Sequence, residues 1–208
     1  MTQALPQLVT FDEFLAWYPE NSTVRYELHD GEIVEMPKPT GTHSKLTGFI
    51  IDELNFKVRE IGKRGIWFIP RECIVKPRSG KSGYEPDIIV LNEETIGLET
   101  RWEKESVIEY ASSVKLIVEV VSTNWRDDYL KKLADYGEMG IPEYWIVDYK
   151  GLGGKLFIGN PKQPTISVYV LEDDEYKLTQ FRGDEIINSP TFPDLQLSVN
   201  QILRFGID

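Results

Sequence analysis

The stretch LIVEVV, residues 116–121, places a single carboxylate, Glu119, inside a run that is otherwise apolar at every position. A run that is apolar on both alternating faces predicts a strand buried on both sides, as in a parallel sheet covered by helices. An ionised carboxylate in such a strand costs several kcal/mol unless a cation pairs with it or it binds a metal. We therefore expect Glu119 to have a chemical task. The alternative is a glutamate near an open sheet edge that reaches solvent.

Regular patterns on both sides of this strand predict an ordered series of elements. Apolar residues recur at three- and four-residue steps from position 42, which predicts a helix to about residue 61. Strand-like runs follow at residues 66–75, 86–91 and 114–121, then a second helix at 126–139 and a fourth strand at 142–148. Because a helix connects the last two strands, they should be parallel, with helices covering the faces of the sheet. The sequence therefore predicts a mixed α/β (α+β) core ordered helix, three strands, helix, strand.

Shorter elements are expected on both sides of this core. Thr10 and Glu13 form a capping-box pattern at the start of a short helix that ends at Tyr18. Asp30-Gly31 separates two strand-like runs and predicts a hairpin. Alternating runs at 156–158, 167–171 and 176–181 predict a C-terminal β-meander. We expect one domain over residues 1–208, with its core at about 24–148 and a β extension at about 155–208.

The composition argues against several classes of protein. No apolar run approaches the roughly 18 residues that a membrane span needs, so no membrane partner is expected. Residues 1–8 are neither basic nor continuously apolar, unlike a secretory signal, which favours a cytoplasmic protein. The chain has 1 cysteine and 2 histidines, too few for an internal disulfide or a zinc site. Cys73 lies in an apolar run and is expected to be structural.

The net charge of −11 argues against a protein that coats nucleic acid, because phosphate binding is largely electrostatic. The charge is uneven, however. Residues 57–81 hold eight basic and two acidic residues, a net charge of +6 (8 − 2), so the rest of the chain carries −17 (−11 − 6). A basic side on an acidic body can face a polyanion. The alternative is a solvated helix end and turn.

A second carboxylate, Asp87, directly follows Pro86 at the start of another predicted strand. Aspartates are common at such positions in turns, so Asp87 alone is weak evidence of function. Together with Glu119 on a neighbouring strand it is more informative, because two close carboxylates repel each other and a hard divalent cation relieves that repulsion. Mg²⁺ favours oxygen ligands of this kind, completed by water, a backbone carbonyl and substrate phosphate.

The helix predicted over residues 126–139 carries two adjacent lysines, Lys131 and Lys132. An apolar stripe through Tyr129, Leu133 and Tyr136 places Lys132 beside the buried face and Lys131 toward solvent. A cation next to two carboxylates and a phosphate could offset developing charge or orient an attacking water. The alternative is a surface lysine whose stem packs on apolar residues.

Several of these residues form an ordered set that resembles a known family. The set comprises Tyr26-Glu-Leu, Asp30-Gly-Glu32, Gly41-Thr-His43, Pro86-Asp87, Val118-Glu-Val-Val-Ser122, Asp128, Lys132, Tyr136 and Gly140-Ile-Pro-Glu-Tyr-Trp-Ile-Val-Asp148. It looks like the Uma-type restriction endonuclease family, which is abundant in cyanobacteria and belongs to the PD-(D/E)XK nuclease superfamily. The likeness covers about residues 24–148. It implies a restriction-endonuclease-like core with the same order of elements.

The resemblance also implies a metal site. Asp87 and Glu119 would be metal ligands, and Val120 would offer its backbone carbonyl. The ion would be Mg²⁺, with Mn²⁺ as the alternative.

The lysine departs from the superfamily pattern. It usually sits two residues after the glutamate, where this chain has Val121. Members of this family supply the lysine from the following helix. That points to Lys132, four residues before Tyr136, rather than to Lys131.

Two further residues, Glu27 and His43, match family positions near the site. We interpret Glu27 as a supporting acid or a second metal ligand. His43, at a helix start, could contact phosphate or act as an acid/base group, and the alternative is a residue that only hydrogen-bonds the helix end. His29 lies in the predicted hairpin turn and is expected to be exposed.

Three functions are compatible with these features. The first is a Mg²⁺-dependent endonuclease that hydrolyses DNA, with residues 57–81 holding the DNA backbone. The second is a catalytically inactive nucleic-acid-binding or assembly module on the same fold, which the net acidity and Val121 favour. The third is a small-molecule hydrolase that uses the same carboxylates and lacks a salt-sensitive affinity for DNA.

The C-terminal aromatic residues bear on the oligomeric state. Many nucleases cut two strands by pairing two copies, so we expect a homodimer. Tyr169, Tyr176 and Phe181, if exposed, could form the dimer face, and the alternative is that they pack in the core.

Overall fold

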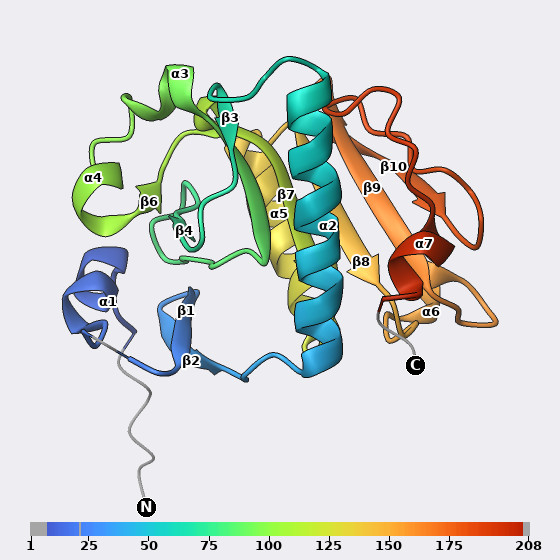
Figure 1. Ribbon diagram of the computed structural model, residues 1–208. Coiled ribbons are helices and arrows are strands. Elements are labelled where there is room, and N and C mark those ends of the chain that lie inside the picture. The colour runs from blue at the N-terminus through green and yellow to red at the C-terminus, as the bar shows by residue number, and fades with distance from the viewer. Residues whose placement is uncertain (1–7, 21, 206–208) are drawn as a thin grey trace, which may run out of the picture.

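The central sheet has six strands in the order β10-β9-β8-β7-β5-β3 (Figure 1). The computed structural model describes residues 8–20 and 22–205. Its strands are β1 (Arg25–His29), β2 (Glu32–Met36), β3 (Trp67–Phe68), β4 (Ile74–Val75), β5 (Ile88–Asn92), β6 (Val107–Ile108), β7 (Val114–Val120), β8 (Glu143–Asp148), β9 (Thr165–Glu172) and β10 (Glu175–Phe181).

The α-helices are α1 (Phe11–Trp17), α2 (Gly41–Glu60), α3 (Glu93–Ile96), α4 (Trp102–Glu105), α5 (Leu133–Met139), α6 (Lys155–Ile158) and α7 (Val199–Leu203). A 3₁₀ turn, η1 (Ala111–Ser113), precedes β7, and a π-helix, η2 (Asp127–Lys132), leads directly into α5. None of the described helices is both long and apolar enough to cross a membrane.

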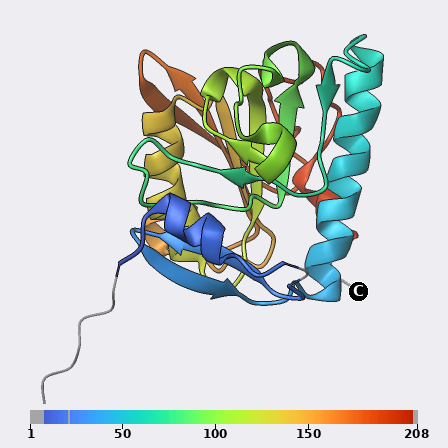
Figure 2. The same ribbon diagram turned by 90° about the vertical axis from the view of Figure 1, so that its left-hand side faces the viewer.

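Strand β7 lies inside the sheet, parallel to β8 and antiparallel to β5. The predicted parallel pair is therefore confirmed. Helices α2 and α5 cover opposite faces of the sheet (Figure 2). Val118 packs in the cluster that contains Ile50 of α2, and Ile117 packs in the cluster that contains Tyr136 of α5. Since side chains alternate along a strand, Glu119 points to the same side as Ile117, toward η2 and α5.

The prediction of one continuous strand over residues 66–75 is wrong. Its first part, β3, pairs with β5 in the central sheet, whereas its second part, β4, pairs with β6 in a separate two-stranded sheet. Pro70 lies between the two parts and has no amide hydrogen to donate to a sheet. The apolar run therefore divides into two short strands.

The predicted C-terminal meander is a hairpin, β9–β10, that extends the central sheet beyond β8. The strand predicted at residues 156–158 is wrong, because this segment is the helical turn α6. Phe157 and Ile158 both pack against the core, whereas Leu156 is 90% exposed. Two consecutive inward side chains fit a helical turn and not a strand, in which neighbours point to opposite faces.

The aromatic residues considered for a dimer face pack inside the protein. Tyr169 is 6% exposed and Phe181 is 8% exposed. The partly buried Tyr176 donates its hydroxyl hydrogen to the carbonyl of Ile141 at 2.9 Å. Of the two alternatives for these residues, core packing is therefore confirmed, and the homodimer stays a prediction without their support.

The β1–β2 hairpin lies below the central sheet in the view of Figure 2. At its turn Asp30 has φ 51° and Gly31 has φ 89°, the positive values that a type I′ turn requires, so the predicted hairpin is confirmed. Leu28 and Gly83 exchange two backbone hydrogen bonds of 2.9 Å, which attach β1 to the segment before β5. The predicted capping box of α1, formed by Thr10 and Glu13, is also present.

Gly83 should be sensitive to substitution because it lies where β1 meets α1. A Cβ at this position would lie 2.6 Å from Cε2 of Phe11, and Phe11 is only 2% exposed. Gly83→Ala should lower the free energy of unfolding by about 1–3 kcal/mol through overpacking, measured by urea denaturation. Gly97→Ala is the control, because its Cβ would meet nothing within 4 Å. Equal stability of the two variants would contradict this packing.

Candidate active site

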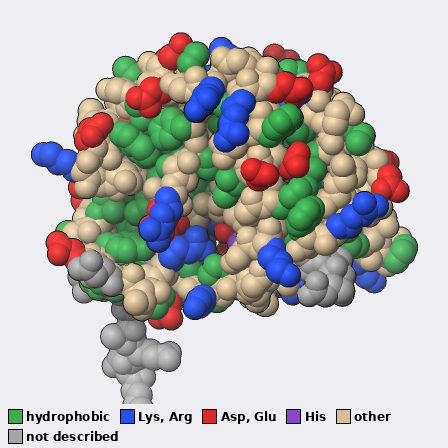
Figure 3. All heavy atoms as spheres, in the orientation of Figure 1, with side chains coloured by type: hydrophobic (Ala, Val, Ile, Leu, Met, Phe, Trp, Pro, Cys, Tyr) green, Lys and Arg blue, Asp and Glu red, His purple; other side chains and the backbone are tan. Residues whose placement is uncertain are grey.

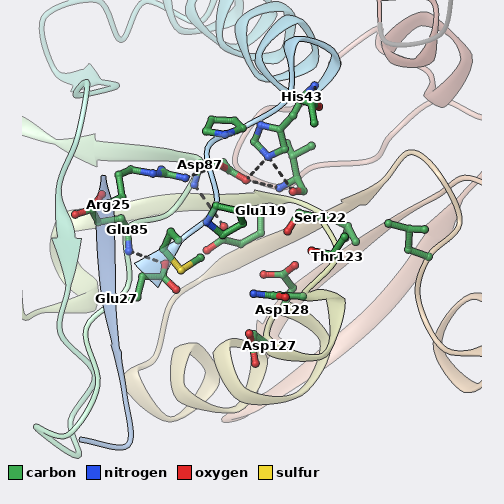
Figure 4. A pocket seen from close by; sticks show the side chains of 18 of the residues that line it. Arg25, Glu27, His43, Glu85, Asp87, Glu119, Ser122, Thr123, Asp127 and Asp128 are labelled. Atoms are coloured by element: carbon green, nitrogen blue, oxygen red, sulfur yellow. Dashed lines mark hydrogen bonds and ion pairs between the residues drawn. The ribbon is translucent and has the colours of Figure 1, made fainter. Parts of the chain in front are cut away.

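A cleft of about 220 Å³ opens beside the C-terminal end of β7. Its walls come from the start of α2, the β1–β2 hairpin, the segment before β5, and η2 (Figure 4). The structure brings together in this cleft every residue expected at the site: Glu27, His43, Asp87, Glu119, Val120 and Lys132. Residues from five separate segments of the chain (β1, the start of α2, the segment before β5, β7 and η2) therefore meet at one place.

Glu119 is 3% exposed and has hydrogen-bond partners on both carboxylate oxygens. Its Oε1 accepts from Nζ of Lys132 at 3.1 Å and from the Tyr136 hydroxyl at 3.2 Å. Its Oε2 accepts from the backbone amide of Asp87 at 3.4 Å. Burial raises the pKa of Glu119 well above its usual value, against the opposing charge of Lys132. The expected buried and partnered carboxylate is therefore present in the strand.

Asp87, His43 and the backbone of Val120 form a second group of contacts. Oδ2 of Asp87 accepts from the Val120 amide at 2.9 Å and lies 3.1 Å from Nε2 of His43. The same imidazole nitrogen lies 3.1 Å from the Val120 carbonyl oxygen. Burial alone would lower the pKa of His43, but the hydrogen bond and charge of Asp87 outweigh it and raise that pKa. A proton on Nε2 therefore faces two oxygen atoms, and Thr40 caps the helix turn that carries the ring.

Lys132 is the last residue of η2 and is 3% exposed. Its Nζ lies near three carboxylate oxygens: Glu119 Oε1 (3.1 Å), Glu27 Oε1 (3.2 Å) and Asp128 Oδ1 (3.7 Å). Desolvation would lower the pKa of Lys132, but these negative charges raise it well above its usual value. Lys131 instead pairs with the exposed Asp30. The predicted inward lysine is therefore Lys132, and the π-helical turn that presents it is a feature common at functional sites.

Glu27 joins Lys132 to the hairpin. Its Oε1 also accepts the backbone amide of Glu85 at 3.0 Å, and its Oε2 lies 2.8 Å from Nε2 of His29. Burial would raise the pKa of Glu27, but the charge of Lys132 and the contacts with His29 lower it to about 2. The expectation that His29 is exposed in the turn is wrong. It belongs to β1, its side chain is 11% exposed, and its ring packs against Tyr84.

Two further charged residues lie at the site: Arg25, which was not predicted from the sequence, and Asp128, which is part of the set that carries the family resemblance but was given no role. Asp128 is 8% exposed, and burial is the main cause that raises its pKa to about 7. Nη2 of Arg25 lies 4.0 Å from Oδ1 of Asp87, and the Arg25 side chain is 35% exposed at the cleft. The available signals were positional: Asp128 lies four residues before Lys132, and Arg25 lies two residues before Glu27 and so on the same face of β1.

The donor set fits a divalent cation of the Mg²⁺ type. Four carboxyl groups (Glu27, Asp87, Asp128 and Glu119) face two cations (Arg25 and Lys132), so the group carries an excess of two negative charges (4 − 2) when all four are ionised. The raised pKa values of Glu119 and Asp128 show that this full ionisation is unfavourable in the site as it stands. In the described part of the chain, no group of three or more His, Cys, Asp or Glu side chains is arranged to hold a metal by itself. Mg²⁺ is commonly held by one or two carboxylates, with water and substrate phosphate as the other ligands. The carboxylates of Asp87 and Glu119 and the carbonyl of Val120 are sufficient for such a site.

Comparison with known proteins agrees with the resemblance noted in the sequence. A sequence model of the Uma2 family, described as "Putative restriction endonuclease", matches residues 11–200. A crystal structure from Anabaena variabilis ATCC 29413, described as a putative nuclease belonging to DUF820, has a TM-score of 0.69 at 22% identity, over 96% of this chain and 99% of that chain. No curated protein matches the chain. The fold is restriction-endonuclease-like, and the chain belongs to the Uma2 family.

Proposed function

We propose that the protein is a Mg²⁺-dependent endonuclease that hydrolyses phosphodiester bonds in DNA. The observation that carries this proposal is the meeting of Asp87, Glu119, the Val120 carbonyl and Lys132 in one cleft. Family membership supports a nuclease, and the excess negative charge of the site supports a divalent cation.

We assign the ligand role to the Asp87 and Glu119 carboxylates and to the Val120 carbonyl. A divalent cation, when bound, supplies a coordinated water of lowered pKa and positive charge for the phosphate oxygens. The hydrogen bonds from Lys132 and Tyr136 fix one oxygen of Glu119, so that the other remains directed toward Asp87. The chain thus orients its ligands before substrate binds, which lowers the reorganisation needed during the reaction.

His43 is the acid/base candidate of the site. Its Nε2 proton lies between Asp87 Oδ2 and the Val120 carbonyl, both assigned here as ligands. We propose that the imidazole donates this proton to a phosphate oxygen or to the leaving oxygen when Asp87 and the Val120 carbonyl serve as metal ligands. Glu27 acts through Lys132, which it holds against Glu119.

The basic segment 57–81 does not form one rim of this cleft. His43 lies in the first turn of α2, at the cleft (Figure 1). Arg59 lies 16 residues further along the helix, about 24 Å away at 1.5 Å per residue. Within the segment, Lys57 is buried and bound to Glu60, and Lys76 pairs with Glu109. The expectation that this segment holds the DNA backbone therefore stays a prediction for its exposed basic residues, which lie away from the cleft.

Basic side chains are instead present near the cleft itself. Arg25, Lys38 and Lys150 line it, and Lys38 and Lys150 are exposed. Figure 3 shows Lys and Arg side chains around a hollow in which acidic and histidine side chains are visible. We propose that these nearer cations guide DNA to the site.

The direct test combines metal binding with a cleavage assay. Calorimetry should detect Mg²⁺ or Mn²⁺ binding that Glu119→Gln abolishes, and the wild type should cut plasmid or single-stranded DNA only when one of these ions is present. Metal binding without cleavage, together with DNA binding, would instead favour an inactive nucleic-acid-binding module. Metal binding without any salt-sensitive affinity for DNA would favour a small-molecule hydrolase.

A further inference from the structure

The lysine of the site is buried among carboxylates. Nζ of Lys132 donates hydrogen bonds to Glu27 at 3.2 Å and to Glu119 at 3.1 Å, and Asp128 lies 3.7 Å away, as an ion-pair partner beyond hydrogen-bond distance. Its side chain is 4% exposed, beneath those carboxylates. A phosphate could reach this nitrogen only by displacing one of its buried partners. That exchange is unfavourable, because it leaves a carboxylate buried without its cation.

Arg25, unlike Lys132, is accessible from the cleft opening. Its side chain is 35% exposed where the cleft opens, and its approach to Asp87 Oδ1, at 4.0 Å, is longer than a hydrogen bond. Among the described residues its guanidinium has no hydrogen-bond acceptor. Five N–H donors in a planar fork match two oxygens of a phosphate. Figure 4 shows Arg25 beside Asp87 at the same cleft.

The backbone holds Arg25 in this place. Arg25 begins β1 and pairs with Met36 of β2. Since side chains alternate along a strand, Arg25 lies on the same face as Glu27, whose carboxylate binds Lys132. The Leu28–Gly83 hydrogen bonds attach this strand to the segment that leads to Asp87. The hairpin therefore presents a buried anion to the lysine and an accessible cation to the cleft opening.

We propose that Arg25, and not Lys132, is the cationic side chain that binds the substrate phosphate, as a catalytic residue of the proposed nuclease reaction. This assignment rests on the proposed function and deepens it. Asp87 keeps the guanidinium over the site, and the guanidinium donates to the non-bridging phosphate oxygens as negative charge develops on them. Lys132 is then a positioning residue that acts through Glu119.

The first test is kinetic. Arg25→Gln should lower kcat/KM for DNA cleavage by about 10²- to 10³-fold, the usual effect of removing one donor to a developing anion. Arg25→Lys should recover part of this loss, because it restores the charge without the planar fork. Guanidinium ion at millimolar concentration should partly restore Arg25→Ala, which a structural role would not produce. Mg²⁺ binding, measured by calorimetry, should persist in all three variants.

The second test reads binding without cleavage. In a Glu119→Gln background, adding Arg25→Gln should weaken the binding of a fluorescein-labelled oligonucleotide. The slope of the logarithm of the binding constant against the logarithm of the salt concentration should fall by the equivalent of about one phosphate contact. Arg59→Gln is the matched control, because it removes the same charge at the far end of α2. Wild-type kinetics in Arg25→Gln, or equal losses in Arg25→Gln and Arg59→Gln, would overturn the Arg25 assignment alone. A wild type that neither binds nor cuts DNA would overturn the proposed function and this assignment with it.

Discussion

Asp87→Asn should reduce metal-dependent DNA cleavage by about 10³-fold or more while leaving the fold intact. Losing a charged metal ligand removes several kcal/mol of transition-state stabilisation, and each 1.4 kcal/mol is about a factor of ten in rate. The fold should persist because an asparagine carbonyl can still accept the 2.9 Å hydrogen bond from the Val120 amide. The variant removes the repulsion between Asp87 and Glu119 but also the charge that pairs with His43, so the free energy of unfolding should change little.

The matched control for this variant is Asp127→Asn. Asp127 lines the same cleft and carries the same charge, but we assign it no ligand role. Supercoiled plasmid relaxation with Mg²⁺ gives the rates, and urea denaturation gives the free energy of unfolding. Asp127→Asn should cleave at about the wild-type rate. If Asp87→Asn also cleaved at that rate, Asp87 would not be a ligand and the assigned ligand set would be wrong.

The central part of the site was predictable because its signals are local in the sequence. Glu119 is conspicuous because its strand is apolar on both faces, and the structure places that strand inside the sheet. Lys132 follows from the apolar stripe of its own helix, which separates it from Lys131. In both cases burial can be inferred from the periodicity of neighbouring residues alone.

The remaining features depend on contacts between distant segments. Glu27 and Arg25 reach the cleft because Leu28 pairs with Gly83, 55 positions later, and no local pattern predicts that pairing. His29 was expected to be exposed because it was placed in the hairpin turn, yet it belongs to β1 and its ring packs against Tyr84. The excess charge of the site likewise depends on the tertiary structure, because its charged residues come from four segments: β1, the segment before β5, β7 and η2.

Lys132→Met should lower the free energy of unfolding by about 3–5 kcal/mol near pH 8. The variant leaves the buried carboxylates of Glu27, Glu119 and Asp128 without their shared cation, and removing one partner of a buried ion pair typically has this effect. Lys131→Met is the matched control. Its partner, Asp30, is 76% exposed, so the expected loss is below about 1 kcal/mol.

The pH dependence of that loss has a definite sign. The pKa of Asp128 is already raised to about 7, and that of Glu119 is raised well above its usual value, in both cases mainly by burial. A carboxylate whose pKa is higher in the folded state binds more protons when folded, so stability falls as pH rises through the folded pKa. The difference in the free energy of unfolding between the wild type and Lys132→Met should therefore decrease as the pH falls from about 8 toward 5.

Divalent cations connect this stability effect to the proposed chemistry. If the negatively charged cleft is a cation site, Mg²⁺ should bind the folded state and not the unfolded state. Mg²⁺ should then raise the midpoint of urea unfolding of Lys132→Met more than that of Lys131→Met. Asp87→Asn combined with Lys132→Met should lose this response, because the ligand pair is gone. A Lys132→Met protein that is destabilised at pH 8 but indifferent to Mg²⁺ would mean that the lysine is the only cation these carboxylates hold. The cleft would then be a structural ion-pair network, and the inactive binding module would be the better account of the protein.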